Sequence, residues 1–281
     1  MKVGIIGAGR VGKCLALELQ AADMLVGLTA STESQNALLA MNFDKPRMTN
    51  AKLWEAADVL LICVPDRLIG SVAAEIAAQV KPAHKVVLHV SGSVGLEPLA
   101  PLEKLGAYVG SLHPLQSFTD SMTRLKGVYM AIDGDDEARQ VARELVQLFG
   151  GKPFTVPASE RAAYHAAACF CSNYAVAVEA VATQLMARWT GSEESAWEAL
   201  LPLFCGTAEN LGSAHKPGEA LTGPIARGDV PTVVKHLTAM PKELLPVYCS
   251  LGLATTKLAL TNGTIDKETA DKLEGLLTAA V

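Results

Sequence analysis

Short runs of β-branched and apolar residues alternate with longer stretches of helical periodicity in the first half of the chain. The runs lie at residues 2–6, 25–29, 59–64, 85–90, 108–112, 128–132 and 153–156. Stretches of helical length lie between several of them, at residues 11–22, 68–80 and 137–149. Continuous apolar runs are typical of strands covered on both faces, and strands that alternate with helices indicate βαβ units. We therefore expect a mostly parallel sheet with helices on its faces.

The pattern changes after about Pro157. No further β-rich run follows, and Ala- and Leu-rich stretches of helical length continue to the C-terminus, with prolines between them. Proline is tolerated in the first turn of a helix, so each proline marks a candidate helix boundary. The sequence predicts an α/β plus α fold, with an α/β domain at residues 1–157 and an all-α domain at residues 158–281.

The longest apolar stretch, residues 162–187, is interrupted by polar side chains. These are His165, Ser172, Asn173, Glu179 and Gln184. A membrane-spanning helix needs about 20 predominantly apolar residues with few or no charges. We therefore interpret the stretch as a buried helix of a soluble domain and not as a membrane span.

Composition narrows the class of protein. Of the 281 residues, 50% are apolar and 19% are charged, and the formal net charge is -5. A chain of this sign without a basic cluster offers no electrostatic surface to nucleic acid or anionic lipid. The start, Met1-Lys2-Val3-Gly4, has no basic segment or cleavage site typical of a secretory signal. We expect a cytoplasmic protein with a small-molecule substrate and with neither nucleic-acid nor membrane partners.

A glycine-rich turn with the spacing GxGxxG ends the first expected strand. Its residues are Gly7, Ala8, Gly9, Arg10, Val11 and Gly12. In this motif the first glycine permits the tight turn, the second lets the backbone approach a pyrophosphate, and the third allows close packing of helix and strand. The following helix N-terminus offers free N–H groups to an anion. The turn predicts an N-terminal Rossmann dinucleotide-binding domain, the alternative being a tight turn without a ligand.

The end of the second expected strand bears on the choice of dinucleotide. A NAD site usually places an acidic residue there, where it accepts a hydrogen bond from the ribose 2′-OH. Here Ser31 and Thr32 follow the strand, and Arg10 lies across the turn. These groups suit a 2′-phosphate better than a carboxylate would, so we predict NADP in preference to NAD. Glu33 lies just beyond and could reach a ribose hydroxyl instead.

Further motifs resemble known families. The glycine-rich turn and the segment ICVPD at 62–66 resemble β-hydroxyacid dehydrogenases, pyrroline-5-carboxylate reductases and ketopantoate reductases, in which a strand ending in Val-Pro lies beside the cofactor. The segments HVSG at 89–92, LHPLQSF at 112–118 and TGPIARGD at 222–229 resemble a functionally unassigned family of Rossmann-like proteins with a helical C-terminal domain of unknown function. Its N-terminal domain is commonly grouped with deazaflavin-dependent NADP oxidoreductases. The resemblance implies an NADP-dependent oxidoreductase with Val64 and Pro65 at the cofactor, although the arginine expected near Ser31 is absent.

Two strand ends carry candidate chemistry. The nicotinamide supplies the hydride, so the protein must position the substrate and handle one proton, a task suited to histidine. His113 follows a predicted strand at the edge where open α/β sheets place ligands. Ser91 and Ser93 follow another strand in the same way, and we assign Ser91 to the cofactor and Ser93 to the substrate. The alternative for His113 is a turn histidine that caps backbone groups before Pro114.

A second polar cluster lies on the apolar helix. His165, Cys169, Ser172 and Asn173 fall at i, i+4, i+7 and i+8, so they share one face. We predict His165 as a second candidate proton donor and Asn173 as the anchor of a substrate carbonyl or amine. In the dehydrogenase relatives the matching helix carries a lysine and an asparagine, and the lysine is missing here. The alternative is that His165 and Asn173 bridge neighbouring helices, since buried polar groups are normally hydrogen-bonded.

Arg227 is the candidate partner of a substrate carboxylate, because arginine binds carboxylates with two hydrogen bonds. An ion pair with Asp229 or with a facing subunit is the alternative. No set of His, Cys and acidic residues has metal-ligand spacing.

Together these features predict an NADP-dependent reductase or dehydrogenase. We expect it to act on a small carbonyl, imine or alcohol that bears a carboxylate, and to form a homodimer through its helical domain. Two alternatives remain open: a non-catalytic dinucleotide-binding sensor or assembly subunit, and a prephenate- or arogenate-like dehydrogenase, suggested by His113-Pro114.

Overall fold

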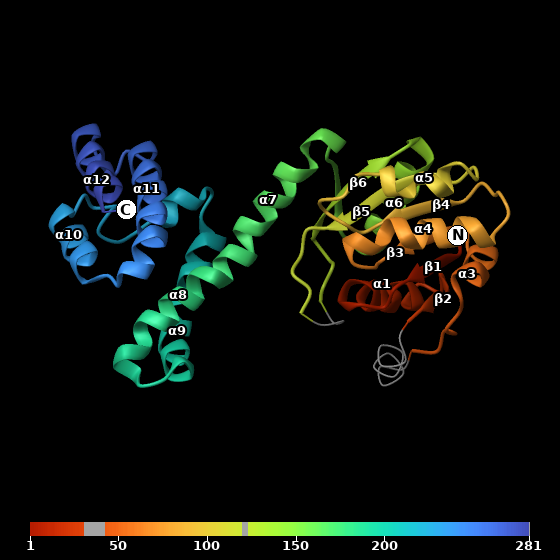
Figure 1. Cartoon of the computed structure of the whole chain (residues 1–281), viewed down its shortest axis with the longest axis horizontal. Helices are drawn as coiled ribbons and strands as arrows, with labels where there is room; N and C mark the ends of the chain where they lie inside the picture. The colour runs from red at the N-terminus through yellow and green to blue at the C-terminus, as the bar shows by residue number, and fades with distance from the viewer. Residues whose placement is uncertain (31–42, 120–122, 281) are drawn as a thin grey trace. The chain divides into compact units, whose positions relative to one another are not determined.

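The computed structural model describes residues 1–30, 43–119 and 123–280 (Figure 1). They form two compact units, Met1–Tyr174 and Ala175–Val281. The change from strands to helices comes near Pro157, as the sequence predicts, whereas the first compact unit continues through the next helix to Tyr174.

A seven-stranded sheet forms the centre of the first unit, in the order β2-β1-β3-β4-β5-β6-β7. Neighbouring strands are parallel except for β5 and β6, which are antiparallel. The strands are β1 (Val3–Ile6), β2 (Leu25–Thr29), β3 (Val59–Ile62), β4 (Val86–His89), β5 (Tyr108–Pro114), β6 (Tyr129–Gly134) and β7 (Lys152–Thr155). The sequence predicted all seven, and the mostly parallel sheet is confirmed.

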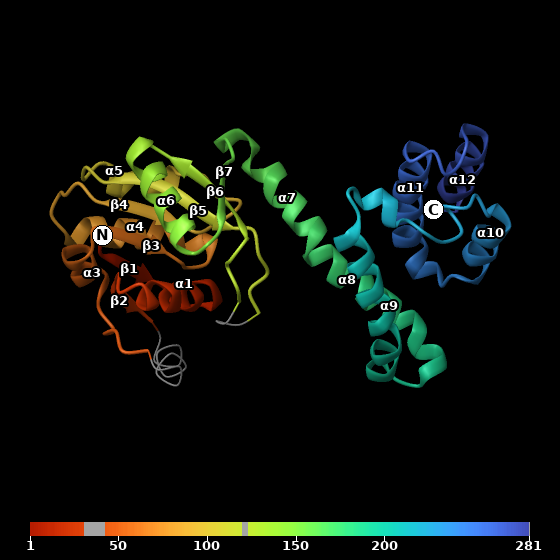
Figure 2. The same ribbon diagram turned by 180° about the vertical axis from the view of Figure 1, so that it is seen from behind.

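Helices cover both faces of this sheet (Figures 1 and 2). They are α1 (Arg10–Ala21), α3 (Asn50–Ala56), α4 (Ile69–Gln79), α5 (Ala100–Glu103) and α6 (Asp136–Leu148). Adjacent strand residues point to opposite faces, and Leu60 and Leu61 are both fully buried, each in a different core cluster. This explains the continuous apolar runs in the sequence.

Helices α3 and α5 were not predicted, because seven and four residues are too few to show a helical period.

One buried arginine joins the next helix to the strand ends. Helix α7 (Arg161–Cys171) begins with Arg161, whose side chain is almost fully buried. Its Nη1 donates to Ser111 Oγ at 2.8 Å, and its Nη2 donates to the Ser91 carbonyl at 2.8 Å. Asp133 of β6 lies 3.5 Å from Nη1 and supplies the opposite charge. The guanidinium therefore ties α7 to the turn after β4, to the middle of β5 and to β6.

The described residues of the second unit form helices and the loops between them, without a strand. Its helices are α8 (Asn173–Thr190, which begins in the first unit), α9 (Glu193–Ser213), α10 (Val230–Ala239), α11 (Leu245–Thr261) and α12 (Lys267–Ala279). Residues of α10, α11 and α12 form its buried core, with Val233, Cys249 and Leu273 at its centre. Asp229 and Asp266 cap α10 and α12 by accepting backbone N–H groups. The predicted all-α region is confirmed.

The predicted burial of the long apolar helix is wrong. The stretch forms two helices, α7 and α8, which meet at Ser172, and α8 has no buried residue. Phe170, Val176 and Trp189 are each 70% exposed, and in α9 only Ala196 is buried. The physical reason is that the core of the second unit is supplied by α10 to α12 and not by α8 and α9.

Two helical stretches have the length and hydropathy of a membrane span. They are Ala158–Thr190, with none of its most apolar window buried, and Lys242–Thr261, with 28% buried. Helices of proteins that do not enter membranes meet the same criteria, so this finding alone does not indicate a membrane.

The role of Arg161 can be tested by the substitution Arg161→Met. Removing the guanidinium leaves the Asp133 carboxylate without its ion-pair partner and the Ser91 carbonyl without its donor. We expect a loss of about 3 kcal/mol in the free energy of unfolding, measured by urea denaturation. Arg143→Met, at an exposed position of α6, should change it by less than about 0.5 kcal/mol. Equal stability of the two variants would contradict the anchoring role.

Candidate functional site

The glycine-rich turn between β1 and α1 has the shape of a phosphate cradle. Gly7 has a φ of 95°, and a Cβ there would lie 2.9 Å from the Cys63 carbonyl oxygen. A Cβ on Gly12 would collide with the Gly7 carbonyl oxygen. Gly9 differs, because a Cβ there would meet nothing within 4 Å. Two glycines are thus required by packing, and Gly9 leaves open space in front of the helix.

The start of α1 suits a negatively charged ligand. Gly9 is the N-cap residue and has no side chain to bind the first N–H groups of the helix, and no acidic residue lies in the first turn. Exposed helical N–H groups and the helix dipole favour an anion at this point. Thr29, at the end of β2, accepts the Gly7 N–H through its Oγ1 at 3.0 Å and so holds the turn against the sheet.

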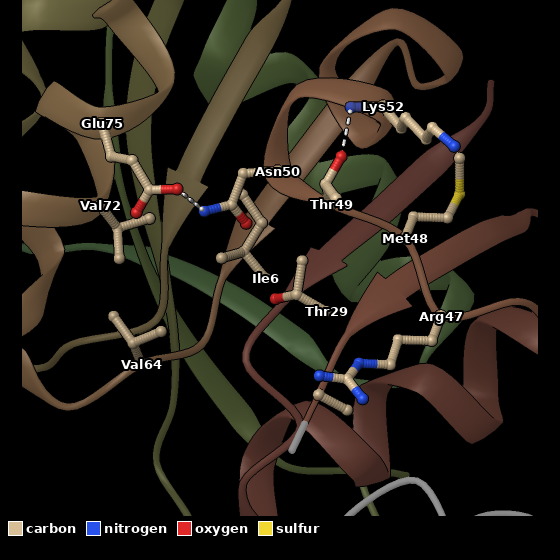
Figure 3. A pocket seen from close by; sticks show the side chains of 11 residues that line it. Ile6, Thr29, Arg47, Met48, Thr49, Asn50, Lys52, Val64, Val72 and Glu75 are labelled. Atoms are coloured by element: carbon tan, nitrogen blue, oxygen red, sulfur yellow. Dashed lines mark hydrogen bonds between the residues drawn. The ribbon is translucent and has the colours of Figure 1, made fainter. Parts of the chain in front are cut away.

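A cavity of about 610 Å³ lies at the end of β2 (Figure 3). Ile6, Val64 and Val72 contribute apolar side chains to it. Asn50 Nδ2 donates to Glu75 Oε1 at 3.2 Å, whereas Asn50 Oδ1 is buried and has no hydrogen-bond partner among the described residues. A carboxylate only accepts hydrogen bonds, so Glu75 fixes the amide with its NH₂ toward itself. The Asn50 oxygen therefore remains available to a donor on a ligand.

Arg47 is brought to the same cavity from outside β2. Leu28 forms an isolated parallel bridge with Arg47, supported by a 2.8 Å hydrogen bond from Met48 N to the Leu28 carbonyl. Arg47 consequently lies beside Thr29, and Figure 3 shows its side chain extending back toward the end of β2. Sequence analysis missed it because one bridged pair leaves no periodic signal.

The residues that sequence analysis assigned to this end of β2 cannot be placed. Ser31, Thr32 and the alternative contact Glu33 lie outside the described residues. Arg10 is described, and it is exposed at the first position of α1.

The turns after β3 and β4 are linked to each other. Val64 and Pro65 lead from β3 into the first turn, and Asp66 of that turn accepts a 2.9 Å hydrogen bond from Ser93 Oγ. The buried Ser91 Oγ accepts the backbone N–H groups of Ser93 and Val94, at 3.3 and 3.1 Å. Ser91 therefore shapes the turn that presents Ser93, which is exposed.

A second cavity, of about 520 Å³, lies beside the end of β5 and along α7. It brings together the three residues that sequence analysis singled out for catalysis, His113, His165 and Asn173, with Cys169 and Ser172 of the predicted polar face.

Tyr164 also lines this second cavity and was not singled out from the sequence. Its position directly before His165 was the available signal, but a tyrosine in an Ala-rich helix has an ordinary packing explanation. The full lining is His113, Leu115, Gln116, Ser117, Tyr164, His165, Ala167, Ala168, Cys169, Cys171, Ser172 and Asn173.

The two histidine rings meet over a glycine. Their centroids are 6.1 Å apart, and His113 Nδ1 lies 2.6 Å from the Tyr164 hydroxyl oxygen. A Cβ on Gly92 would lie 2.8 Å from His113 Nε2 and 2.9 Å from His165 Nδ1, so only glycine fits there. His165 Nδ1 is buried and has no hydrogen-bond partner in the described part of the chain. The hydrogen bond of His113 thus goes to a side chain and not to the backbone groups of the alternative prediction.

Two histidines near these strand ends have lowered pKa values. Burial is the largest cause for His113, and together with the nearby His165 and the positive charge of Arg161 it lowers the pKa of His113 to about 4. Burial raises the pKa of Tyr164 to about 12. Burial and the positive charge of Arg161 also lower the pKa of His89 to about 4. The Nδ1 of His89 accepts the Ser91 N–H, and its Nε2 lies 2.9 Å from the Gly95 carbonyl oxygen. Both histidines are therefore uncharged imidazoles in the folded protein.

Arg227 lies in the second unit, where it is exposed in the turn before α10. The Asp229 carboxylate, its alternative partner, accepts hydrogen bonds from Thr232 N at 3.1 Å and from Thr232 Oγ1 at 2.7 Å. Asp229 therefore acts as the cap of α10, and a role for Arg227 in substrate binding stays a prediction.

Comparison with known families agrees with the architecture. Residues 1–114 match the family model described as a Rossmann-like domain, and residues 128–255 match the one described as a domain of unknown function, DUF2520. The chain thus combines these two domains, and the resemblance drawn from the sequence is confirmed. No curated protein matches the sequence.

Solved structures of oxidoreductases share this fold. A candidate NADP oxidoreductase of Bacteroides fragilis has a TM-score of 0.74 at 20% identity, over 91% of this chain and 98% of that one. Pyrroline carboxylate reductase of Plasmodium falciparum, solved with NADP bound, has a TM-score of 0.60 at 15% identity, over 98% of both chains. Reductive aminase of Aspergillus terreus, in complex with NADPH and ethyl-5-oxohexanoate, has a TM-score of 0.58 at 15% identity, over 99% of this chain and 93% of that one. At these identities the likeness establishes the fold.

The buried histidines predict how stability depends on pH. Their folded-state pKa of about 4 lies below the ordinary value of 6.5, so below pH 6.5 the unfolded chain binds more protons than the folded chain. The free energy of unfolding should therefore fall between about pH 6.5 and pH 4, and these two groups contribute no slope above that range. His89→Gln should lessen this fall in urea denaturation, whereas His84→Gln, at an exposed position, should not. Identical pH curves for His89→Gln and the wild type would refute the assignment.

Proposed function

We propose that this combination of a Rossmann-like and a DUF2520 domain is an oxidoreductase that uses a nicotinamide dinucleotide and prefers NADP. The observation that carries the proposal is the β1–α1 turn, in which packing requires Gly7 and Gly12 while Gly9 leaves open space at an uncapped helix N-terminus. A pyrophosphate is the ligand that this arrangement fits. The neighbouring cavity adds the unpartnered Asn50 oxygen, which can accept from a ribose hydroxyl or an adenine amine.

Arg47 supports the preference for NADP. It lies at the end of β2, where a Rossmann domain distinguishes a ribose 2′-OH from a 2′-phosphate. Its guanidinium can form charge-assisted hydrogen bonds with a phosphate, and it supplies the cation that was absent from the sequence near Ser31. Arg10, Ser31 and Thr32 remain proposed contacts of the cofactor, together with Ala8, Val11, Val64, Pro65 and Ser91.

The second cavity is the proposed place of reaction. A bound reduced nicotinamide supplies the hydride, and the protein supplies the proton and holds the substrate. His113 and His165 are the proposed proton-handling residues, since both line the cavity and lie against the Gly92 backbone. Asn173, in the same lining, offers an amide to a carbonyl or amine, and Ser93 and Arg227 are further proposed substrate contacts. The proposed substrate is a small carbonyl, imine or alcohol compound, and one with a carboxylate would suit Arg227.

The proposal is tested by fluorescence titration of the protein with NADPH and, separately, with NADH. We expect NADPH to bind more tightly than NADH. Arg47→Gln should weaken NADPH binding about tenfold or more and leave NADH binding unchanged, since a hydrogen bond to a charged group contributes about 1.5–3 kcal/mol. The matched control Arg143→Gln should bind both like the wild type.

Failure of the folded wild type to bind either dinucleotide would overturn the oxidoreductase proposal. Equal loss of both cofactors in Arg47→Gln would overturn the assignment of the 2′-phosphate to Arg47. Consumption of bound NADPH in the presence of oxo acids or imines would then separate an enzyme from a sensor that binds the dinucleotide without turnover.

We also propose that a second copy of the chain covers the α8–α9 segment, residues 173–213, to form a homodimer. Its large apolar side chains are exposed, among them Val176 and Trp189 at 70% and Leu203 at 69%. Large exposed apolar patches often mark sites where proteins associate. A second copy carries the same apolar surface, so a two-fold interface would cover both at once.

Light scattering coupled to size-exclusion chromatography measures this state. The wild type should have the mass of a dimer, and Val176→Asp should shift it to the monomer because a carboxylate would be buried in the interface. Leu251→Asp, at an exposed leucine of α11, should remain dimeric. A monomeric wild type would rule out the dimer.

A further inference from the structure

Tyr164 and His113 form a short hydrogen bond in the second cavity, and the proposed function does not use it. The Tyr164 hydroxyl oxygen lies 2.6 Å from His113 Nδ1, and the two rings are nearly perpendicular, with centroids 5.6 Å apart. Phe154 of β7 also contacts the tyrosine ring, with centroids 5.8 Å apart. The tyrosine ring therefore contacts both an aromatic side chain and the histidine to which it is hydrogen-bonded.

The chemistry of the two groups decides which one donates. A phenol is a stronger hydrogen-bond donor than a neutral imidazole N–H, and an imidazole nitrogen lone pair is a stronger acceptor than a phenol oxygen. His113 is neutral near pH 7, so one of its two ring nitrogens carries a proton and the other does not. With the hydroxyl donating to Nδ1, that proton must be on Nε2. This is the nitrogen that faces the Gly92 backbone, beside the unpartnered Nδ1 of His165.

We propose that Tyr164 and His113 form a proton relay, in which the Tyr164 hydroxyl donates to Nδ1 and holds the imidazole proton on Nε2, ready for transfer to the substrate. The catalytic meaning of this relay rests on the proposed function, whereas the relay itself is a property of the chain alone. His113 is the residue that would touch the substrate, and Tyr164 acts through it.

The steps of the relay balance. As the substrate carbon accepts a hydride from a reduced nicotinamide, the Nε2–H bond breaks and an O–H or N–H bond forms on the substrate. Nδ1 takes the phenolic proton, so the imidazole stays neutral and Tyr164 becomes a phenolate, which then regains a proton from water. In the oxidative direction the same transfers run in reverse.

Arg161 favours this arrangement from one turn earlier on α7. Burial raises the pKa of Tyr164 to about 12, and the positive charge of Arg161 acts against this rise, so it lessens the cost of forming the transient phenolate. The same charge lowers the pKa of His113 and so disfavours an imidazolium there. A relay through a neutral histidine is consistent with both effects, whereas a permanently protonated His113 is not.

The experiment is an NMR measurement of the His113 tautomer in the full-length protein without any ligand. Long-range ¹H–¹⁵N correlation on histidine-labelled protein distinguishes the Nε2–H tautomer, the Nδ1–H tautomer and the imidazolium, and His113→Gln identifies the His113 signals. We expect a single Nε2–H tautomer in the wild type at pH 7. Tyr164→Phe keeps the ring and its packing and removes only the donor, so it should convert His113 to a mixture of tautomers. Tyr174→Phe, at a 52% exposed tyrosine, should leave the signals unchanged.

An Nδ1–H tautomer or an imidazolium in the wild type would overturn the relay, and so would a Tyr164→Phe spectrum identical to that of the wild type. Titration of the same samples with NADPH separates this result from the fate of the proposed function. The NADPH titration of the wild type is the readout for the proposed function, because the His113 tautomer is measured without any ligand. An Nδ1–H tautomer or an imidazolium in a wild type that binds NADPH overturns the relay alone, whereas absence of NADPH binding in the wild type overturns the oxidoreductase and leaves the relay without its catalytic meaning.

Discussion

The buried guanidinium of Arg161 is the constraint on which the rest of the site depends. Arginine is rarely buried without partners, and here three neighbouring strands and their turns supply them: the Ser91 carbonyl after β4, the Ser111 hydroxyl within β5 and the Asp133 carboxylate of β6. These partners fix the start of α7 against the sheet. One turn later α7 presents Tyr164 and His165 to His113, the second-last residue of β5. Burial is the main cause of the lowered pKa of His113, and the positive charge of Arg161 lowers it further, so this one group contributes to both the geometry and the electrostatics of the cavity.

Binding and chemistry are assigned to different parts of the first unit. The glycine-rich turn and the cavity beside β2 consist of backbone groups, apolar walls, an oriented amide and the cation of Arg47, which suit recognition of a nucleotide. The cavity beside β5 contains the histidines, the tyrosine and Asn173, which suit proton transfer and the orientation of a small polar substrate. Ser93 and Asp66 link the turns after β3 and β4 and make this edge of the sheet continuous.

The sequence predicted the features that depend on local pattern. All seven strands and the three longer helices of the sheet domain follow from apolar runs and helical periodicity, and GxGxxG has the required context of strand, turn and helix. His113, His165 and Asn173 were singled out from strand ends and helix spacing, and they line one cavity although the helix breaks at Ser172; their catalytic roles stay predictions. Arg47 was missed because its place depends on a single bridge to Leu28. Arg161 and Tyr164 were missed because nothing in an Ala-rich helix start distinguishes a buried anchor from a surface residue.

Helix α8 was predicted to be buried and is exposed, since apolar composition does not reveal what covers a helix.

A crystal structure of the protein with NADPH would test the central claim, that the carboxyl edge of this sheet is a dinucleotide site which delivers a nicotinamide to His113. The account predicts the pyrophosphate against the turn from Gly7 to Gly12, the 2′-phosphate on Arg47, and the nicotinamide ring between Ser91 and His113. A nucleotide bound elsewhere on the protein, or a pyrophosphate that does not contact the glycine-rich turn, would contradict it.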